Sequence, residues 1–246
     1  MTLRRLGLRP ALLSVIGRDA EGTALAADCA EMGLMTEYML ADAELPTDQY
    51  MAIEAAGRLV AAIADARSLE QAGARILAPL RDGRLGTQAD PWSGPLALDG
   101  NLTEALLAEI ADNPVFAAAD LRLAPASPGK VARLRPLIGH PRATLYVNCE
   151  EAGLLTGTKP DSAEAGAIAL LAAGAARVLV TDGADAAVDA SPDALHASHP
   201  PRVEAKRITG AGDTFMAAHI AAELRGEDRP KALSGALSAA AQYVAG

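Results

Sequence analysis

The sequence predicts an α/β fold built around one mainly parallel sheet. The first observation is the order of elements: a short apolar strand, a small-residue turn and a helix follow one another at residues 11–32 and again at residues 203–224. The second is composition, since half of the 246 residues are hydrophobic while only 3% are aromatic, so Ala, Leu and Val must fill a large core. A chain of this length suits one large α/β domain, or such a domain with a small appendage.

The first part of the chain should hold a helical turn, a strand, a helix that Asp19 can cap, and three short β runs, at residues 3–8, 11–16, 20–32, 37–41, 49–55 and 58–63. One Gly-containing turn separates the last two runs, which predicts a hairpin. The middle should alternate helices and strands, at residues 68–78, 96–99, 103–111, 121–124, 131–137 and 144–147. The end should hold helix 163–173, strand 178–181, a surface loop at 191–201, strand 203–208 and helices from residues 213 and 232.

Charge and cysteine content narrow the class of protein. The formal net charge of −9 argues against a protein that binds the phosphate backbone of nucleic acids. Cys29 and Cys149 are far apart in sequence, and two lone thiols fit a reducing cytoplasm better than a disulfide framework. The N-terminal apolar run is short and broken by Pro10, and no run of about 18 uncharged apolar residues follows, so we expect a cytoplasmic protein without a membrane span.

The most informative stretch is residues 201–224, where a strand should lead through a glycine-rich turn into a helix. The first amides of a helix have no partner within the helix and lie at the positive end of its dipole, so this arrangement favours an anion. Gly210 and Gly212 let the backbone approach a ligand closely, and Asp213 adds a carboxylate in the first helical turn. Asp213 also has a simpler explanation, because an acidic residue there stabilises a helix by roughly 0.3–1 kcal/mol.

Two other glycine-rich motifs do not fit this stretch. A P-loop requires G-x-x-x-x-G-K-[ST], and the chain contains no such string. The dinucleotide fingerprint requires G-x-G-x-x-G, but Phe215 stands where the third glycine belongs. A Rossmann-type oxidoreductase is therefore disfavoured.

The string TGAGDTF, followed by a helix of small apolar residues, resembles the signature of the ribokinase-like (PfkB) carbohydrate kinase family. The resemblance implies an anion hole for the transferred phosphoryl group, made by Gly210, Ala211 and Gly212. It also implies that Asp213 is the base that deprotonates the substrate hydroxyl. The family commonly has Asp or Asn three residues before the first of these glycines, where this chain has Arg207. That departure concerns the local contacts to ATP and to a cation.

Two further motifs match the family. Asn148-x-x-Glu151 matches its Asn-x-x-Glu motif, which implies that both side chains help to hold Mg²⁺ and the ATP phosphates, largely through water, with Glu151 on the metal side. The same spacing fits a capping box, with Asn at N-cap and Glu at N3, and the two roles are compatible. Thr181-x-Gly183 resembles the family's Thr-x-Gly turn, which with Thr209 would lie against the nucleotide. The implied cofactors are ATP and Mg²⁺, with a monovalent cation such as K⁺ left open.

On the substrate side, residues 35–64 lie where the family has a small β lid over the sugar, and Thr47 would lie at the lid edge near the substrate. Asp99 and Asn101 follow a strand, at the end where open α/β sheets place ligands, although either can equally cap a helix or form a turn. The strings ELPTDQYMAIEAAGRLVAAIADA and APASPGKVARLRPLIGHPRATLYVNCEEAGLLTG resemble the pseudouridine kinase branch in particular. Pseudouridine is therefore the first expected substrate, and another sugar or nucleoside the second.

Taken over the whole chain, the resemblance implies a single ribokinase-like domain at residues 1–246, a three-layer sandwich with residues 35–64 as a small β lid insertion. The lid also offers a surface for a homodimer. Family members begin with a further strand and a Gly-Gly turn that hold the sugar hydroxyls, and they usually continue beyond the last residue here, so we expect truncation at both termini. A catalytically silent kinase fragment is the alternative to an active kinase.

Overall fold

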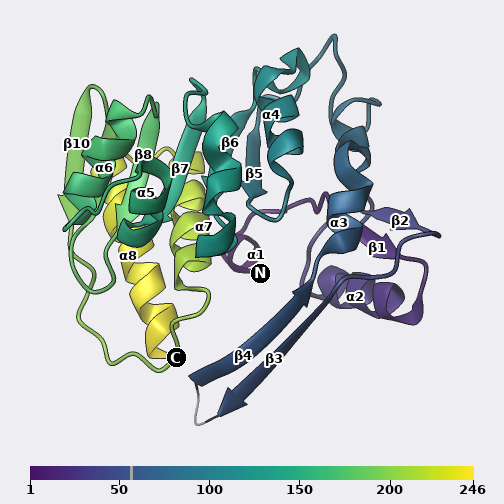
Figure 1. Ribbon diagram of the computed structural model, residues 1–246, viewed down its shortest axis with the longest axis horizontal. Coiled ribbons are helices and arrows are strands. Elements are labelled where there is room, and N and C mark those ends of the chain that lie inside the picture. Colours follow the sequence, from purple (N-terminus) through teal and green to yellow (C-terminus); the bar gives the residue numbers. More distant parts are fainter. Residues whose placement is uncertain (56–57) are drawn as a thin grey trace. The chain divides into compact units, whose positions relative to one another are not determined.

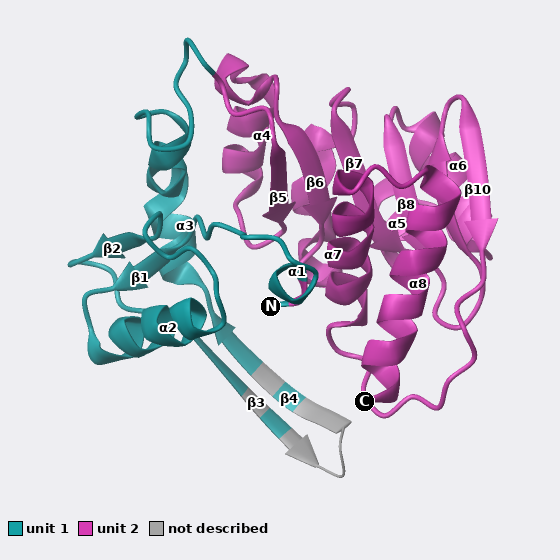
Figure 2. Ribbon diagram, turned by 180° about the vertical axis from the view of Figure 1, so that it is seen from behind, with its two compact units in different colours: residues 1, 3–90 teal, residues 2, 91–246 magenta. Residues whose placement is uncertain are grey.

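The computed structural model describes residues 1–55 and 58–246. The chain divides into two compact units, which Figure 2 distinguishes by colour. Unit 1 comprises Met1 and residues 3–90, and unit 2 comprises Thr2 and residues 91–246. The single domain that we expected from the sequence stays a prediction.

Unit 1 holds short elements and a hairpin (Figure 1). Its helices and strands are α1 (Thr2–Arg5), β1 (Val15–Gly17), α2 (Ala20–Glu31), β2 (Leu40–Asp42), β3 (Gln49–Ala55), β4 (Arg58–Asp65), α3 (Arg67–Ala72) and the 3-10 helix η1 (Gly73–Leu80). Strand β1 pairs in parallel with β2, and β3 pairs antiparallel with β4, so the expected hairpin is confirmed. The strand expected at 11–16 is shorter, because its neighbour β2 begins only at Leu40.

The hairpin β3–β4 carries an apolar stripe on one face. Met51 lies opposite Ile63, and Ile53, two residues along the same strand, lies opposite Ala61. The side chains of Met51, Ile53 and Ile63 are 66%, 59% and 72% exposed. The structure does not describe the side chain of Val60. The hairpin face that the sequence assigns to the lid is therefore apolar, and its described side chains are exposed to solvent.

Unit 2 is built on a six-stranded sheet. Its elements are β5 (Pro95–Asp99), α4 (Glu104–Asp112), the 3-10 helix η2 (Pro114–Phe116), β6 (Asp120–Ala124), the 3-10 helix η3 (Pro128–Leu137), β7 (Ala143–Asn148), α5 (Cys149–Thr156), α6 (Ala163–Ala172), β8 (Arg177–Thr181), β9 (Ala187–Ser191), β10 (Ala194–Ser198), α7 (Ala211–Leu224) and α8 (Arg229–Ala245). The strand order is β10-β9-β8-β7-β6-β5. Strands β5 to β8 are parallel and β9 and β10 join antiparallel, which confirms a mainly parallel sheet.

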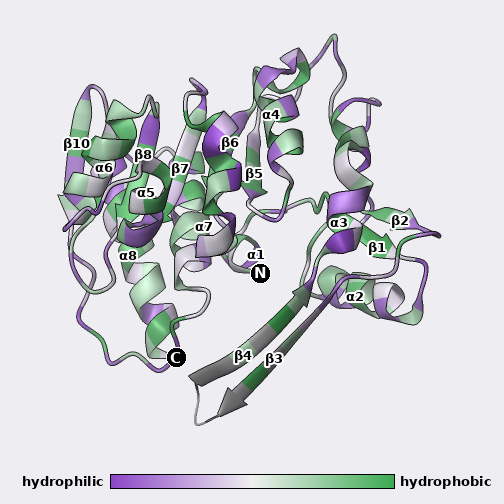
Figure 3. Ribbon diagram, in the orientation of Figure 1, coloured by the Kyte–Doolittle hydropathy of each residue, from purple (hydrophilic) through white to green (hydrophobic). Residues whose placement is uncertain are grey.

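Helices cover both faces of this sheet, which gives three layers. Figure 1 shows α4, α5 and α6 in front of the strands, and Figure 2 shows α7 and α8 on the opposite face. Figure 3 shows that strands β6 to β8 carry hydrophilic as well as hydrophobic segments. Leu121, Leu145 and Val178 are completely buried, and α7 is buried from Thr214 to Ala222. The mainly parallel sheet between two helix layers that we expected from the sequence is therefore present in unit 2.

Two expectations for residues 191–208 are wrong. The expected loop at 191–201 contains strand β10, which pairs with β9 after a tight turn at Pro192 and Asp193. The expected strand at 203–208 is not a strand. Ile208 is 77% exposed, and the amides of Lys206 and Arg207 bond to the Val244 carbonyl instead of to a sheet edge.

The helices expected at 68–78 and 131–137 differ in the structure. The first is α-helical only as α3, to Ala72, and continues as the 3-10 helix η1, which contains Pro79, while the second is the 3-10 helix η3 throughout and contains Pro136. Proline removes an amide donor and disfavours an α-helical interior, which accounts for the difference. No helix among the described residues has the length and apolar content needed to cross a membrane.

Candidate functional site

Polar residues end three parallel strands of unit 2, of which β7 and β8 are neighbours and β5 is separated from β7 by β6. Asp99 ends β5, Asn148 ends β7 and Thr181 ends β8. Because these strands are parallel, their carboxyl ends lie at one edge of the sheet, and Asn148 stands directly opposite Thr181 in register. This is the edge at which open α/β sheets bind ligands.

Asn148 and Glu151 form a capping box at the start of α5. The Glu151 amide donates to Asn148 Oδ1 at 2.9 Å, and the Asn148 amide donates to Glu151 Oε2 at 2.9 Å. Burial raises the pKa of the Glu151 carboxyl. Its second oxygen, Oε1, has no hydrogen-bond partner in the part of the chain that the structure describes, so the cap leaves one carboxylate oxygen for a further ligand.

The Thr181-x-Gly183 turn lies beside this helix start. Gly183 has φ +57°, a left-handed conformation that glycine adopts readily. Burial, followed by the negative charge of Asp182 between Thr181 and Gly183, raises the pKa of the Cys149 thiol to about 11. The structure thus brings together Asn148, Glu151 and Thr181, which are separate in sequence, and it gives Cys149 no reactive thiolate near neutral pH.

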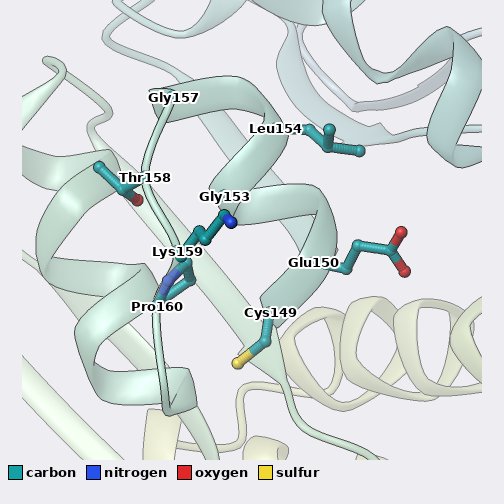
Figure 4. Close-up of a pocket in the computed structure, with 8 residues that line it drawn as sticks. All are labelled: Cys149, Glu150, Gly153, Leu154, Gly157, Thr158, Lys159 and Pro160. Atoms are coloured by element: carbon teal, nitrogen blue, oxygen red, sulfur yellow. The ribbon is translucent and has the colours of Figure 1, made fainter.

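A hollow of about 570 Å³ lies near α5 but does not contain the predicted site residues (Figure 4). The residues that line it are Cys149, Glu150, Gly153, Leu154, Gly157, Thr158, Lys159 and Pro160. All of them belong to α5 or to the loop that follows it. The predicted motifs therefore point to the sheet edge and not to this hollow.

Residues 209–212, here called the glycine turn, precede and open α7. Gly210 is the N-cap, with φ +89°. The Ala211 amide donates to the Ile208 carbonyl, and the Thr214 amide donates to the Gly210 carbonyl. The amides of Gly210, Gly212 and Asp213 have no partner among the described residues. Gly212 and Asp213 are exposed, so the start of this 14-residue helix offers free donors and a carboxylate to solvent.

Asp99, Asn101 and Lys130 form a polar cluster after β5. Asp99 Oδ1 accepts from the Asn101 amide at 2.9 Å, and its Oδ2 accepts from Asn101 Nδ2 at 2.8 Å. Lys130 Nζ, on η3, donates to Asn101 Oδ1 at 2.8 Å. Thr103, not Asn101, caps α4. Sequence reasoning missed Lys130, and the only available signal was its position at the helix start that follows strand β6.

Thr47 lies in unit 1, where it binds the turn that follows β1. Its hydroxyl accepts from the Gly17 amide at 2.9 Å and donates to Asp19 Oδ1 at 2.6 Å, while its amide donates to Asp19 Oδ2 at 2.8 Å. These bonds, with that of the Gly22 amide, lower the pKa of Asp19, the Thr47 hydroxyl having the largest effect. Thr47 is buried, so its observed contacts stabilise this turn, and its role toward a substrate stays a prediction.

The residues present fit a magnesium ion bound largely through water. No group of three or more His, Cys, Asp and Glu side chains gathers as a direct metal site within residues 1–55 and 58–246. Glu151 nevertheless offers a carboxylate oxygen at the sheet edge. Mg²⁺ commonly uses one or two carboxylates and keeps several waters, so a single such oxygen is sufficient.

Comparison with known proteins gives the family. The family model described as "pfkB family carbohydrate kinase" matches residues 1–245, whereas no curated protein matches. A carbohydrate kinase from Agrobacterium tumefaciens is 28% identical with a TM-score of 0.79, over 98% of this chain and 75% of that one. A ribokinase from Thermotoga maritima is 19% identical with a TM-score of 0.77, over 100% and 78%.

A protein from E. coli whose structure holds ATP and Mg²⁺ is 18% identical with a TM-score of 0.74, over 100% of this chain and 80% of that one. These likenesses at low identity concern the fold, and they agree with the family match over nearly the whole chain. The chain belongs to the pfkB family of carbohydrate kinases.

Proposed function

We propose that this chain transfers the γ-phosphoryl group of ATP to a primary hydroxyl of a ribose-like substrate. The observation that carries the proposal is the start of α7, where exposed Asp213 adjoins the unpartnered amides of Gly210 and Gly212. A helix start with free amides stabilises negative charge on a transferring phosphoryl group. The family membership supplies the class of reaction.

In this proposal Asp213 accepts the proton of the attacking hydroxyl as its oxygen bonds to the γ-phosphorus, while the bond from that phosphorus to the bridging oxygen breaks and ADP leaves. The amides of Gly210, Gly212 and Asp213 donate to the phosphoryl oxygens. The Ala211 amide is already bonded to the Ile208 carbonyl, so Ala211 shapes the glycine turn rather than donating. The reaction class therefore requires the turn to present its donors in one fixed orientation.

The nucleotide side consists of Asn148, Glu151, Thr181, Gly183 and Thr209. Glu151 would hold Mg²⁺ through water, with the capping box fixing its side chain. Bound there, Mg²⁺ would neutralise charge on the phosphates. The E. coli protein whose structure contains ATP and Mg²⁺ supports this cofactor pair by likeness of fold.

The substrate side of unit 2 consists of Asp99, Asn101 and Lys130, and Thr47 stays a separate candidate within unit 1. Asn101 donates two hydrogen bonds to the Asp99 carboxylate, and the Lys130 ammonium group donates one hydrogen bond to Asn101. The remaining donors of Lys130 suit the hydroxyls of a sugar or the carbonyls of a pyrimidine base. Pseudouridine is our first candidate because of the sequence resemblance, and another sugar or nucleoside is the second.

The test is ADP formation with ATP and Mg²⁺ in the presence of pseudouridine, uridine, ribose or adenosine, with the product identified by ³¹P NMR. We expect phosphorylation of pseudouridine at the highest kcat/KM. Higher turnover with ribose or adenosine would replace pseudouridine and keep the reaction class. Binding of ATP without transfer to any acceptor would favour the second candidate, a catalytically silent fragment.

A further inference from the structure

Tyr243, near the end of α8, contacts the glycine turn 34 residues earlier in the chain. Its hydroxyl donates to the Thr209 carbonyl at 3.0 Å. The guanidinium carbon of Arg207 lies 4.0 Å from the centre of the Tyr243 ring. Arg207 Nε donates to the Tyr243 carbonyl at 2.7 Å. Three separate contacts therefore join Tyr243 to Thr209 of the glycine turn and to Arg207, which precedes the turn.

The glycine turn and Tyr243 are also fitted to each other sterically. A Cβ atom added at Gly210 would lie 2.6 Å from the Tyr243 hydroxyl oxygen and 3.1 Å from the ring carbon that bears it. The amides of Lys206 and Arg207 bond to the Val244 carbonyl at 2.9 and 3.3 Å. Since residues 203–208 have no sheet partner among the described residues, the end of α8 is what holds this approach to the turn.

The bond to the Thr209 carbonyl acts directly on a proposed donor. A peptide unit is planar and trans, so the Thr209 carbonyl and the Gly210 N–H point in opposite directions within one rigid group. Fixing the carbonyl on Tyr243 therefore fixes the direction of the Gly210 N–H. The Gly210 amide itself has no hydrogen-bond partner among the described residues, so it is available to a ligand.

We propose that Tyr243 is a positioning residue for phosphoryl transfer, which holds the 209–210 peptide so that the Gly210 N–H is directed at the transferring group. The inference rests on the proposed function of the glycine turn. Arg207, stacked on the ring and bonded to the helix end, keeps Tyr243 in place. Donors that act on the charge of the transition state must be oriented before the reaction, so this role concerns kcat more than ATP binding.

Tyr243→Phe is the first test, because it removes the hydroxyl and retains the ring beneath Arg207. We expect kcat to fall about three- to tenfold, the range expected for one neutral hydrogen bond, with the KM for ATP within about twofold of the parent. Tyr146→Phe is the matched control, since it also removes one hydroxyl hydrogen bond but lies in a buried cluster with His219 and Arg122. It should lower thermal stability and leave kcat unchanged.

A readout without turnover separates this inference from the proposed function. In ¹⁵N-labelled protein, the shift of the Gly210 amide on adding ATP with Mg²⁺ should be smaller in Tyr243→Phe than in the parent. An unchanged ATP-induced shift and unchanged kcat in Tyr243→Phe, in a parent that is an active kinase, would overturn the positioning role alone. A parent with no ATP response at Gly210 and no turnover would overturn both proposals.

Discussion

His219 of α7 lies with its Nδ1 2.9 Å from the hydroxyl of Tyr146 on β7, and both side chains are buried. Arg122 of β6 donates to the same hydroxyl at 2.9 Å and also to Glu223 of α7. His219 Nε2 has no hydrogen-bond partner among the described residues and lies 3.9 Å from Asp189 Oδ2. Helix α7 is thus anchored to the sheet by polar contacts at the end remote from Asp213.

This cluster predicts a stability that falls between neutral pH and pH 4. Burial, the largest cause, lowers the pKa of His219 from 6.5 to about 4, against the attraction of Glu223 and Asp189 and with the repulsion of Arg177 and Arg122. As pH falls, His219 is protonated in the unfolded chain before it is protonated in the folded protein. The free energy of unfolding therefore decreases as pH falls from about 6.5 towards 4. Asp189, with a pKa of about 2, loses its own contribution only at lower pH.

Thermal unfolding of the parent and of His219→Gln between pH 4 and 7 measures this effect. The unfolding temperature of the parent should drop across the window, and the drop should be smaller in His219→Gln, whose amide does not titrate. Parallel pH profiles of the two proteins would show that His219 does not control the acid sensitivity.

Asp213→Asn should abolish phosphoryl transfer and leave ATP affinity nearly intact. General-base catalysis contributes roughly 10²–10⁴-fold, and the substitution removes the carboxylate while keeping the size of the side chain. Turnover and ATP binding by calorimetry are measured on the same preparation. Asp193→Asn, in the exposed turn between β9 and β10, is the matched control. Turnover of Asp213→Asn within a few-fold of the parent would remove Asp213 from the mechanism.

Glu151→Gln should raise the Mg²⁺ concentration needed for half-maximal turnover several-fold. The Gln side chain oxygen can still accept from the Asn148 amide, so the capping box survives while the negative charge on the metal side is lost. Mg²⁺ titrations of the rate give the comparison. A variant with the parent's Mg²⁺ dependence and only a lower unfolding temperature would leave Glu151 with the capping role alone.

Local spacing predicted the features of the site that depend on neighbours in sequence. The Asn148–Glu151 cap follows from a three-residue separation, and the open start of α7 follows from glycines next to a helix. Contacts between distant residues left no comparable signal: Arg122 and Glu223 are 101 residues apart, and Lys130 and Asn101 are 29 apart. The exposed run at 203–208 has strand-like residues, but no free sheet edge among the described residues accepts it.

The hairpin face formed by Met51, Ile53 and Ile63 should mediate self-association. A two-stranded hairpin is marginally stable alone, and exposed apolar side chains in a stripe favour a partner surface. We expect the parent to sediment as a dimer at micromolar concentration and Ile63→Lys as a monomer. Ile168→Lys, on an exposed position of α6, should not change the mass. A monomeric parent would leave the stripe to the proposed substrate lid.

Activity should be independent of K⁺, because Arg207 provides a fixed cation where the family commonly has Asp or Asn. Its Nε donates to the Tyr243 carbonyl at the end of α8, where the helix dipole is negative and would otherwise attract a free cation. Turnover in equal concentrations of KCl, NaCl and tetramethylammonium chloride should therefore agree within about twofold.

Arg207→Asp should lower turnover by about tenfold or more in tetramethylammonium chloride, since it removes the guanidinium and places a carboxylate beside helix carbonyls. K⁺ should restore part of that loss in Arg207→Asp, and Arg225→Asp, at the end of α7, should show no such restoration. Strong activation of the parent by K⁺ would show that Arg207 does not replace the cation.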